Sequence, residues 1–140
     1  MAVPLAAVRV MVIDDNDFLR ETIAAMLAEI GFHHVSQARD GNDALGQLER
    51  VDPELIICDI SMKPMDGFGF VGSLRKHPWP RAKDVPVIFL TVHTEAAMVK
   101  RAVTLKVNAY VVKPVQKKQL EARILTVLEN AVVRRSGVSL

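Results

Sequence analysis

The chain has 140 residues, of which 50% are hydrophobic and 24% are charged, and its formal net charge is +2. These values predict one globular domain and exclude a disordered or membrane-spanning chain. Because the Lys and Arg residues are scattered rather than clustered, we expect no nucleic-acid partner for this chain. The single cysteine, Cys58, cannot form an internal disulfide and favours a reducing, cytoplasmic location, with its side chain packed in the core.

The first part of the chain predicts strands separated by a helix with clear limits. Apolar, mostly β-branched runs at 8–13 and 55–59 fit strands covered on both faces, and the more polar run at 35–38 fits an edge strand. Between the first two runs, apolar residues at helical spacing follow Asn16, a suitable N-cap, and stop at Gly31.

The rest of the chain continues the alternation of helices and strands. The further expected elements are a helix after the 40–41 turn, a short helix at about 68–76, a strand at 85–90, a helix capped by Thr94 and running to about Leu105, a strand at 108–112, and a last helix carrying Leu120, Ile124, Leu125 and Leu128. The proline-rich stretch 77–85 predicts a polar surface connection. We expect one domain over residues 1–133 and a frayed tail over 134–140.

Five strands that alternate with five helices predict an α/β fold with a doubly wound parallel sheet and helices on both faces. The strand order 2-1-3-4-5 is taken from known folds of this class. In such a sheet, ligands bind beyond the carboxyl ends of the strands, so the residues that end each strand are the candidates for a site.

Four of the five strands end in residues that can do chemistry. Asp14 and Asp15 follow the first strand, Asp59 ends the third, Thr91 follows the fourth, and Lys113 follows the fifth. These four strands are neighbours in the expected order. We therefore expect three carboxylates, one hydroxyl and one ammonium group to meet at one edge of the sheet.

This combination of groups predicts a metal-dependent phosphoryl acceptor. Three close carboxylates repel one another unless a cation lies between them, and Mg²⁺ prefers one or two carboxylates together with water and phosphate oxygens. Asp14 and Asp15 suit the cation, which leaves Asp59 as a carboxylate nucleophile. Lys113 and Thr91 can each hold a phosphoryl oxygen.

Taken singly, these residues have ordinary structural explanations. An acidic pair such as Asp14 and Asp15 stabilises the N-terminus of a helix, and a hydroxyl such as that of Thr91 often caps a backbone group. Only their combination at successive strand ends indicates a site. The four histidines share no metal-ligand spacing, so we expect no zinc or iron site.

Over its whole length the chain resembles the receiver domains of two-component response regulators, which have a flavodoxin-like fold. The motifs that carry the resemblance, each at its own strand end, are Asp14-Asp15, Asp59 with Met62, Met65, Asp66 and Gly67 behind it, Thr91, and Tyr110-Val111-Val112-Lys113-Pro114. Each motif is common by itself, and their order along the chain makes the resemblance specific.

The resemblance implies a phosphorelay function. A sensor histidine kinase or a histidine phosphotransfer protein would donate a phosphoryl group to Asp59. Mg²⁺, or Mn²⁺ in its place, would be bound by Asp14, Asp15, Asp59 and the backbone carbonyl of Ser61. The domain would catalyse only its own phosphorylation and dephosphorylation, so it would not be an enzyme in the usual sense.

The resemblance also implies a switch. Thr91 would move toward the phosphoryl group, Tyr110 would turn inward, and a cis peptide would join Lys113 to Pro114. The face formed by the fourth helix, the fifth strand and the fifth helix would contact a downstream protein, or a second copy of the chain in a homodimer. Ser61 and His93, at the mouth of the pocket, would tune the lifetime of the phosphoryl group.

Two positions depart from the family pattern. The family usually has Pro four residues after the acceptor, where this chain has Lys63 followed by Pro64. Many members have Gly where Lys106 ends the fourth helix, so a left-handed backbone at Lys106 would carry about 1 kcal/mol of strain. Neither departure touches the acid pocket.

Two other functions fit the same architecture. A flavodoxin-like cofactor module would need a hydroxyl- and glycine-rich phosphate loop after the first strand, where this chain has Asp-Asp-Asn-Asp. A phosphohydrolase of the haloacid dehalogenase type would have a second acid at position 61, where this chain has Ser. No output domain is expected within these residues, and the sequence fits either a stand-alone receiver or part of a longer protein.

Overall fold

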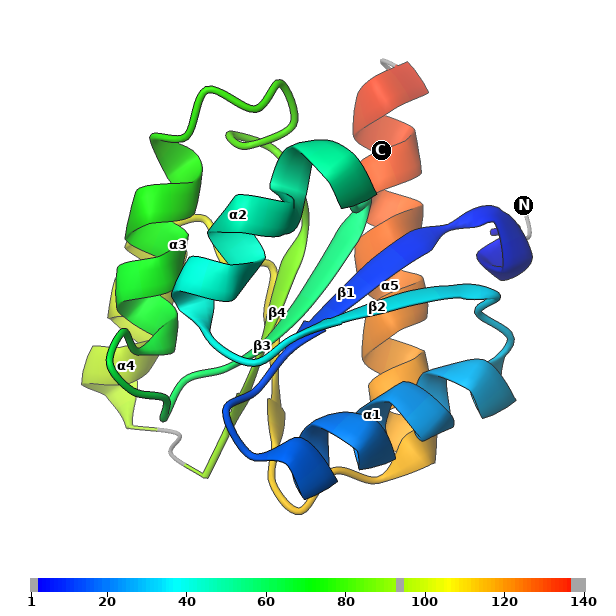
Figure 1. Ribbon diagram of the computed structural model, residues 1–140. Coiled ribbons are helices and arrows are strands. Elements are labelled where there is room, and N and C mark those ends of the chain that lie inside the picture. The colour runs from blue at the N-terminus through cyan, green and yellow to red at the C-terminus, as the bar shows by residue number, and fades with distance from the viewer. Residues whose placement is uncertain (1–2, 93–94, 137–140) are drawn as a thin grey trace.

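The computed structural model describes residues 3–92 and 95–136, which form a five-stranded parallel sheet and five α-helices (Figure 1). The order β2-β1-β3-β4-β5 confirms the expected doubly wound fold. The strands are β1 (Arg9–Ile13), β2 (His34–Ala38), β3 (Leu55–Asp59), β4 (Val87–Thr91) and β5 (Ala109–Val112). The helices are α1 (Asp17–Ile30), α2 (Gly41–Val51), α3 (Gly67–Arg75), α4 (Ala96–Thr104) and α5 (Lys117–Ser136), after a short 3-10 helix at Leu5–Ala7.

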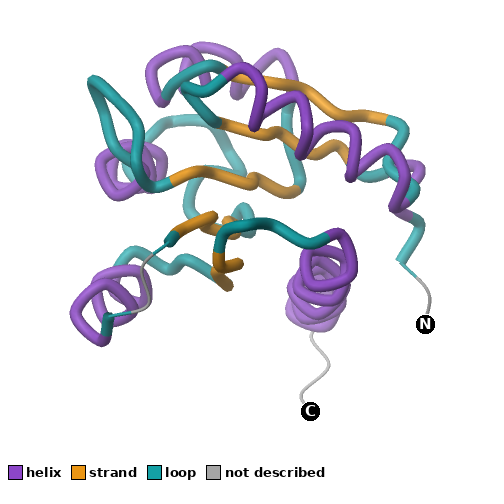
Figure 2. Tube along the Cα trace, turned by 90° about the horizontal axis from the view of Figure 1, so that it is seen from below, coloured by secondary structure: helices purple, strands orange, loops and turns teal. Residues whose placement is uncertain are grey.

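Helices lie on both sides of the sheet, and each side has its own hydrophobic cluster among the described residues (Figure 2). Successive residues of a strand point to opposite faces. In β1, Met11 and Ile13 therefore join the cluster with α2 and α3, whereas Val10 and Val12 join the cluster with α1 and α5. Burial on both faces explains the unbroken apolar runs of β1, β3 and β4.

Cys58 on β3 is fully buried in the first of these clusters. Burial, followed by the nearby charges of Asp59 and Asp14, raises the pKa of Cys58 well above its ordinary value. A thiol that stays protonated is a poor nucleophile and a poor metal ligand. Cys58 is therefore a core residue, as the sequence predicts.

Polar side chains fix the starts of three helices. The Oδ1 atom of Asn16 accepts a hydrogen bond from the Leu19 amide at 3.0 Å, which confirms it as the cap of α1. Asp40 and Asp66 cap α2 and α3 in the same way, by accepting from the amides of Asp43 and Gly69. Each cap satisfies an amide that has no partner within its helix.

Several expected helix and strand limits shift by a few residues. α4 begins at Ala96 after Glu95, and the expected cap Thr94 lies outside the described residues. β4 begins at Val87 rather than at residue 85. α5 continues to Ser136, so the expected tail boundary at 133/134 falls inside a helix. Even this longest helix of the described ranges lacks the combination of length and apolar character needed to cross a membrane.

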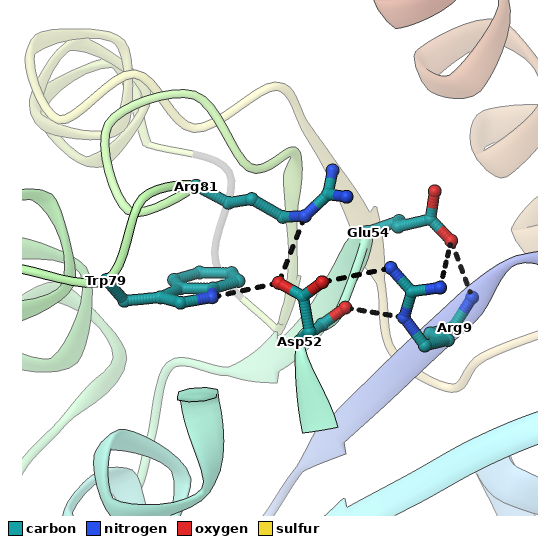
Figure 3. Close-up of polar contacts among 5 residues, drawn as sticks. All are labelled: Arg9, Asp52, Glu54, Trp79 and Arg81. Carbon is teal, nitrogen blue, oxygen red and sulfur yellow. Dashed lines mark hydrogen bonds and ion pairs between the residues drawn. The ribbon is translucent and has the colours of Figure 1, made fainter. Parts of the chain in front are cut away.

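The connection between α3 and β4 is more than a surface loop, and this expectation was wrong. Trp79 is only 3% exposed, and Ala82 and Val85 are also buried in the core. The Nε1 atom of Trp79 donates to Oδ1 of Asp52 at 3.0 Å (Figure 3). The indole thus fills core volume while its one polar atom has a partner, which is the usual condition for burying a tryptophan.

Asp52 joins three parts of the chain at the amino-terminal end of the sheet, namely the end of α2, β1 and the connection between α3 and β4 (Figure 3). Besides Trp79, its carboxylate contacts Arg81 at 3.0 Å and Arg9 at 3.2 Å, and its carbonyl accepts from Nε of Arg9 at 2.7 Å. Arg9 also contacts Glu54. This cluster lies at the end of the parallel strands opposite to Asp59, so it supports the fold without entering the acid pocket.

Candidate functional site

The strand ends meet as expected at the carboxyl edge of the sheet. Asp14, Asp15 and Asp59 each offer a carboxylate oxygen, and these oxygens lie within 4.8 Å of one another. The Nζ atom of Lys113 lies 2.7 Å from Oδ1 of Asp59. Thr91, at the end of β4, is buried, and its carbonyl accepts from the Lys113 amide at 2.8 Å.

Asp14 is buried, yet one of its carboxylate oxygens lacks a partner. Its Oδ1 atom accepts from the Asn16 amide at 2.9 Å, whereas Oδ2 is the one buried side-chain polar atom without a hydrogen bond among the described residues. Burial raises the pKa of Asp14, and the charge of Asp59 adds to this effect against the lowering by the Asn16 hydrogen bond. A buried, unpaired carboxylate oxygen is costly unless a cation completes it.

Asp15 faces solvent beside Asp14. Its Oδ2 atom accepts a hydrogen bond from the Lys63 amide at 3.2 Å, which joins the β1–α1 loop to the loop after β3. The loop that carries Asp14 and Asp15 and the loop that follows Asp59 are therefore held together by one of the candidate metal ligands. A cation bound there would have solvent on the Asp15 side, which suits an ion that retains water molecules.

The backbone turns sharply after Asp59, and Gly67 makes that turn feasible. A Cβ atom at Gly67 would lie 2.8 Å from both the carbonyl oxygen of Asp59 and Cα of Ile60. The carbonyl of Ile60 accepts from the amides of Gly67 at 2.8 Å and Met62 at 3.0 Å. This close approach of backbone to backbone explains physically why a glycine ends the loop that follows Asp59.

The remaining candidates from the sequence are Ser61, Tyr110 and His93. Ser61 is exposed directly after Ile60, and Tyr110 is 37% exposed on β5, so its ring does not point into the core. His93 lies outside the described residues. The Lys113–Pro114 peptide is cis, as the resemblance implies, and the Lys63–Pro64 peptide, for which we made no such expectation, is also cis.

One residue near the pocket escaped the sequence analysis. Arg20 on α1 donates from Nη1 to the main-chain carbonyl of Asp14 at 2.9 Å. A signal for it exists in the sequence: a cation in the first turns of a helix opposes the helix dipole, so an arginine there needs a specific partner. That partner lies in the β1–α1 loop.

The chemistry available at this edge follows from its carboxylate oxygens and its ammonium group. Oxygen ligands from carboxylates suit a hard divalent cation such as Mg²⁺. A buried carboxylate, Asp59, lies next to an ammonium group that can follow a phosphoryl oxygen as charge develops. The arrangement fits phosphoryl transfer to a carboxylate, and it lacks a hydroxyl- and glycine-rich loop that would hold a phosphate without a metal.

Comparisons with known proteins agree with this geometry. The family model described as the response regulator receiver domain matches residues 10–125. A probable transcriptional regulator, ycf27, of Porphyridium aerugineum is 37% identical over 86% of this chain and 48% of its own length. A probable chemotaxis protein CheY of Rhizobium etli is 30% identical over 84% of this chain and 89% of its own length.

Solved structures show the same fold. Chemotaxis protein CheY4 of Vibrio cholerae has a TM-score of 0.80 with 27% identity, covering 86% of this chain and 98% of that one. The receiver domain of a signal transduction histidine kinase from Syntrophus aciditrophicus has a TM-score of 0.77 with 26% identity, covering 89% of this chain and 92% of that one. The chain spans about half the length of the ycf27 relatives, such as 48% of the first. By the family match, this chain belongs to the response regulator receiver domains of two-component signalling.

Proposed function

We propose that Asp59 accepts a phosphoryl group from a sensor histidine kinase or a histidine phosphotransfer protein, and that this transfer requires a divalent cation. The observation that carries the proposal is the unpaired, buried Oδ2 atom of Asp14 within a cluster of three carboxylates. A cation there would satisfy that oxygen and relieve the repulsion between the carboxylates. The family match supports the same conclusion and favours it over a flavin module or a phosphohydrolase.

The residues that would hold Mg²⁺, or Mn²⁺, are Asp14, Asp15, Asp59 and the backbone carbonyl of Ser61. When bound, the cation would neutralise carboxylate charge and the charge on the transferring phosphoryl group. The exposure of Asp15 and Ser61 fits a site with room for water and for an incoming phosphate.

In the transfer step a carboxylate oxygen of Asp59 attacks phosphorus while the bond from phosphorus to the donor's imidazole nitrogen breaks. The electron pair of that bond stays on the imidazole. Lys113, already 2.7 Å from Asp59, shifts to a phosphoryl oxygen, and the Thr91 hydroxyl donates to another. The signal ends by hydrolysis: water attacks phosphorus, the bond to Asp59 breaks, and inorganic phosphate leaves. Ser61 and His93 would regulate the approach of that water.

Phosphorylation would act by shifting a conformational equilibrium. Moving a mostly inactive ensemble to a mostly active one needs a differential interaction of about 5 kcal/mol, and a doubly negative group held by Thr91, Lys113 and the cation can supply much of it. The ring of Tyr110, which is exposed in this structure, would turn inward once Thr91 moves. The output would be a changed α4-β5-α5 face for a cytoplasmic partner protein or a second copy of the chain.

The test of the acceptor is incubation with acetyl phosphate, with and without Mg²⁺, followed by intact mass measurement of wild type and Asp59→Asn. A receiver gains one phosphoryl group only with Mg²⁺ and slowly loses it. Continuous release of phosphate would indicate a phosphohydrolase, and equal labelling of both proteins would exclude Asp59.

The switch has a separate test. Amide NMR shifts on adding beryllofluoride should spread from the pocket to Tyr110 and α4. Shifts confined to the acid pocket would argue against a switch, even if Asp59 is the acceptor.

A further inference from the structure

Asp14 is held by hydrogen bonds from three directions, two to its main chain and one to its side chain. Its amide donates to the carbonyl of Ala38 on β2 at 3.2 Å, and its carbonyl accepts from Nη1 of Arg20 at 2.9 Å. Its Oδ1 atom accepts from the Asn16 amide at 2.9 Å. Every hydrogen-bonding group of Asp14 except Oδ2 is thus engaged, and Oδ2 is the oxygen left for a cation.

Each of the three guanidinium nitrogens of Arg20 has a partner. Besides the Asp14 carbonyl, its Nε atom donates to Oε1 of Gln37 on β2 at 3.0 Å, and Nη2 contacts Oδ1 of Asp17 at 2.9 Å. The Arg20 side chain is only 12% exposed. One planar group therefore joins the β1–α1 loop, β2 and α1, a geometry that a lysine cannot reproduce.

The network continues behind Arg20 into α2. The carbonyl of Gln37 accepts from Nε2 of Gln47 at 3.2 Å, and the same amide donates to Oδ1 of Asp43 at 3.0 Å. The acid that follows β2, Asp40, caps α2 and is not a member of the carboxylate cluster. β2 supports the pocket indirectly, because Gln37 accepts from Arg20 and the carbonyl of Ala38 accepts from the Asp14 amide.

The charge of Arg20 does not explain its position. It lies in the first turns of α1, where the helix dipole disfavours a cation, and its charge would also oppose binding of Mg²⁺ nearby. Its hydrogen bonds have the opposite effect, because they hold the loop that carries Asp14 and Asp15. Charge and geometry therefore predict opposite results when Arg20 is replaced.

We propose that Arg20 is a positioning residue that fixes the Asp14 main chain so that Oδ2 faces the divalent-cation site. This inference rests on the proposed metal site. Outer partners that orient metal ligands typically change metal affinity by about 10-fold to 100-fold when they are removed.

The experiment measures the Mg²⁺ dissociation constant by isothermal titration calorimetry for wild type, Arg20→Gln and Arg20→Lys. Positioning predicts about 10-fold weaker binding for both variants. A role through charge alone predicts tighter binding for Arg20→Gln and no change for Arg20→Lys. Affinity equal to wild type in either folded variant, or tighter binding, would overturn the proposal.

A matched control is Arg9→Gln. Arg9 also donates to one backbone carbonyl and contacts two carboxylates, but at the opposite end of the sheet. It should lower thermal stability as Arg20→Gln does and leave the Mg²⁺ affinity unchanged. If Arg9→Gln weakened Mg²⁺ binding equally, general destabilisation would explain the effect and positioning would be rejected.

Two further measurements keep the test decisive. In phosphorylation by acetyl phosphate, the Mg²⁺ concentration at half-maximal rate should rise for Arg20→Lys while the rate at saturating Mg²⁺ stays near wild type. A lower maximal rate alone would contradict positioning.

If Arg20→Gln does not fold, the variant Gln37→Ala, which removes one acceptor of Arg20, takes its place. It should show a smaller loss of Mg²⁺ affinity, and no loss would count against the proposal. Wild type that binds no Mg²⁺ would refute the metal site itself and the positioning role with it.

Discussion

The ammonium group of Lys113 and the carboxylate of Asp59 form an ion pair at 2.7 Å, across 54 positions of sequence. The Asp59 side chain is 4% exposed and that of Lys113 20%, so water screens this pair weakly. Lys113 occupies the place beside Asp59 where a phosphoryl group would develop charge. A cation bound by Asp59 would have to compete with Lys113 for that carboxylate.

Replacing Lys113 by Met should therefore have opposite effects on binding and on chemistry. We expect tighter Mg²⁺ binding, because a positive charge has been removed, and phosphorylation by acetyl phosphate slowed by about 100-fold, because a group that stabilises the transition state is lost. Calorimetry and mass spectrometry measure the two effects. Lys117→Met, which removes an exposed ion pair with Glu29, is the control and should change neither.

Gly67→Ala should destabilise the domain by about 3 kcal/mol, because the new Cβ would meet backbone atoms that cannot easily move. A Cβ atom added at Gly72, in the same helix, would meet no atom of another segment within 4 Å. Gly72→Ala should therefore stabilise the domain by about 0.5–1 kcal/mol. Urea unfolding of both variants gives the comparison. Equal effects would mean that the turn after Asp59 is not as tight as described.

Arg75→Met should be among the most damaging changes far from the pocket. The Arg75 guanidinium donates to the carbonyls of Ala82, Val85, Leu105 and Lys106, at 3.0, 2.9, 3.3 and 2.8 Å. Three of these contacts are part-buried, and removing the donor from their carbonyls should cost about 3 kcal/mol in total. Lys76→Met, next in sequence and exposed, should change stability by less than about 0.5 kcal/mol. A loss below 1 kcal/mol in urea unfolding of Arg75→Met would contradict this account.

Asp52 should give the fold a dependence on acid pH. Burial raises the pKa of Asp52, but hydrogen bonds from Trp79 and Arg81 and the charges of Arg81 and Arg9 outweigh it, so its pKa in the folded state is lowered. A lowered folded pKa stabilises the protein above the unfolded value of about 3.9, and this contribution is lost as pH falls through the folded pKa.

Asp52→Asn isolates that charge, because Asn tolerates the left-handed backbone at this position, where φ is 49°. The variant should be less stable than wild type at pH 7, and the difference should shrink as the pH falls below about 4. Denaturant unfolding over this pH range measures it. A constant difference at all pH values would show that the charge of Asp52 is not responsible.

The convergence of Asp14, Asp15, Asp59, Thr91 and Lys113 was predictable from sequence, because the carboxyl ends of neighbouring parallel strands share one edge. That step needed only the strand positions and a strand order common to the fold class. The capping of α1 by Asn16 and its end at Gly31 were also predictable, since both depend on local backbone chemistry.

Contacts between distant segments were not predictable in this way. The stretch containing Trp79 has the prolines of a surface loop, and the burial of Trp79 depends on the core cluster and on Asp52, which lies 27 residues earlier. Arg20 belongs by spacing to the polar side of α1, and its partners in the β1–α1 loop and on β2 come together only once the sheet is assembled. Gly67 belongs to a motif visible in the sequence, but its close approach to Asp59 is a property of the folded backbone.

The most direct test of the account identifies the residue that carries the phosphoryl group. After reaction with acetyl phosphate and Mg²⁺, borohydride reduces an aspartyl phosphate to homoserine, and peptide mass spectrometry then locates the homoserine. The account predicts homoserine at position 59 only, and none when Mg²⁺ is removed by a chelator. Homoserine at position 14 or 15, or equal conversion of Asp59 without Mg²⁺, would contradict it.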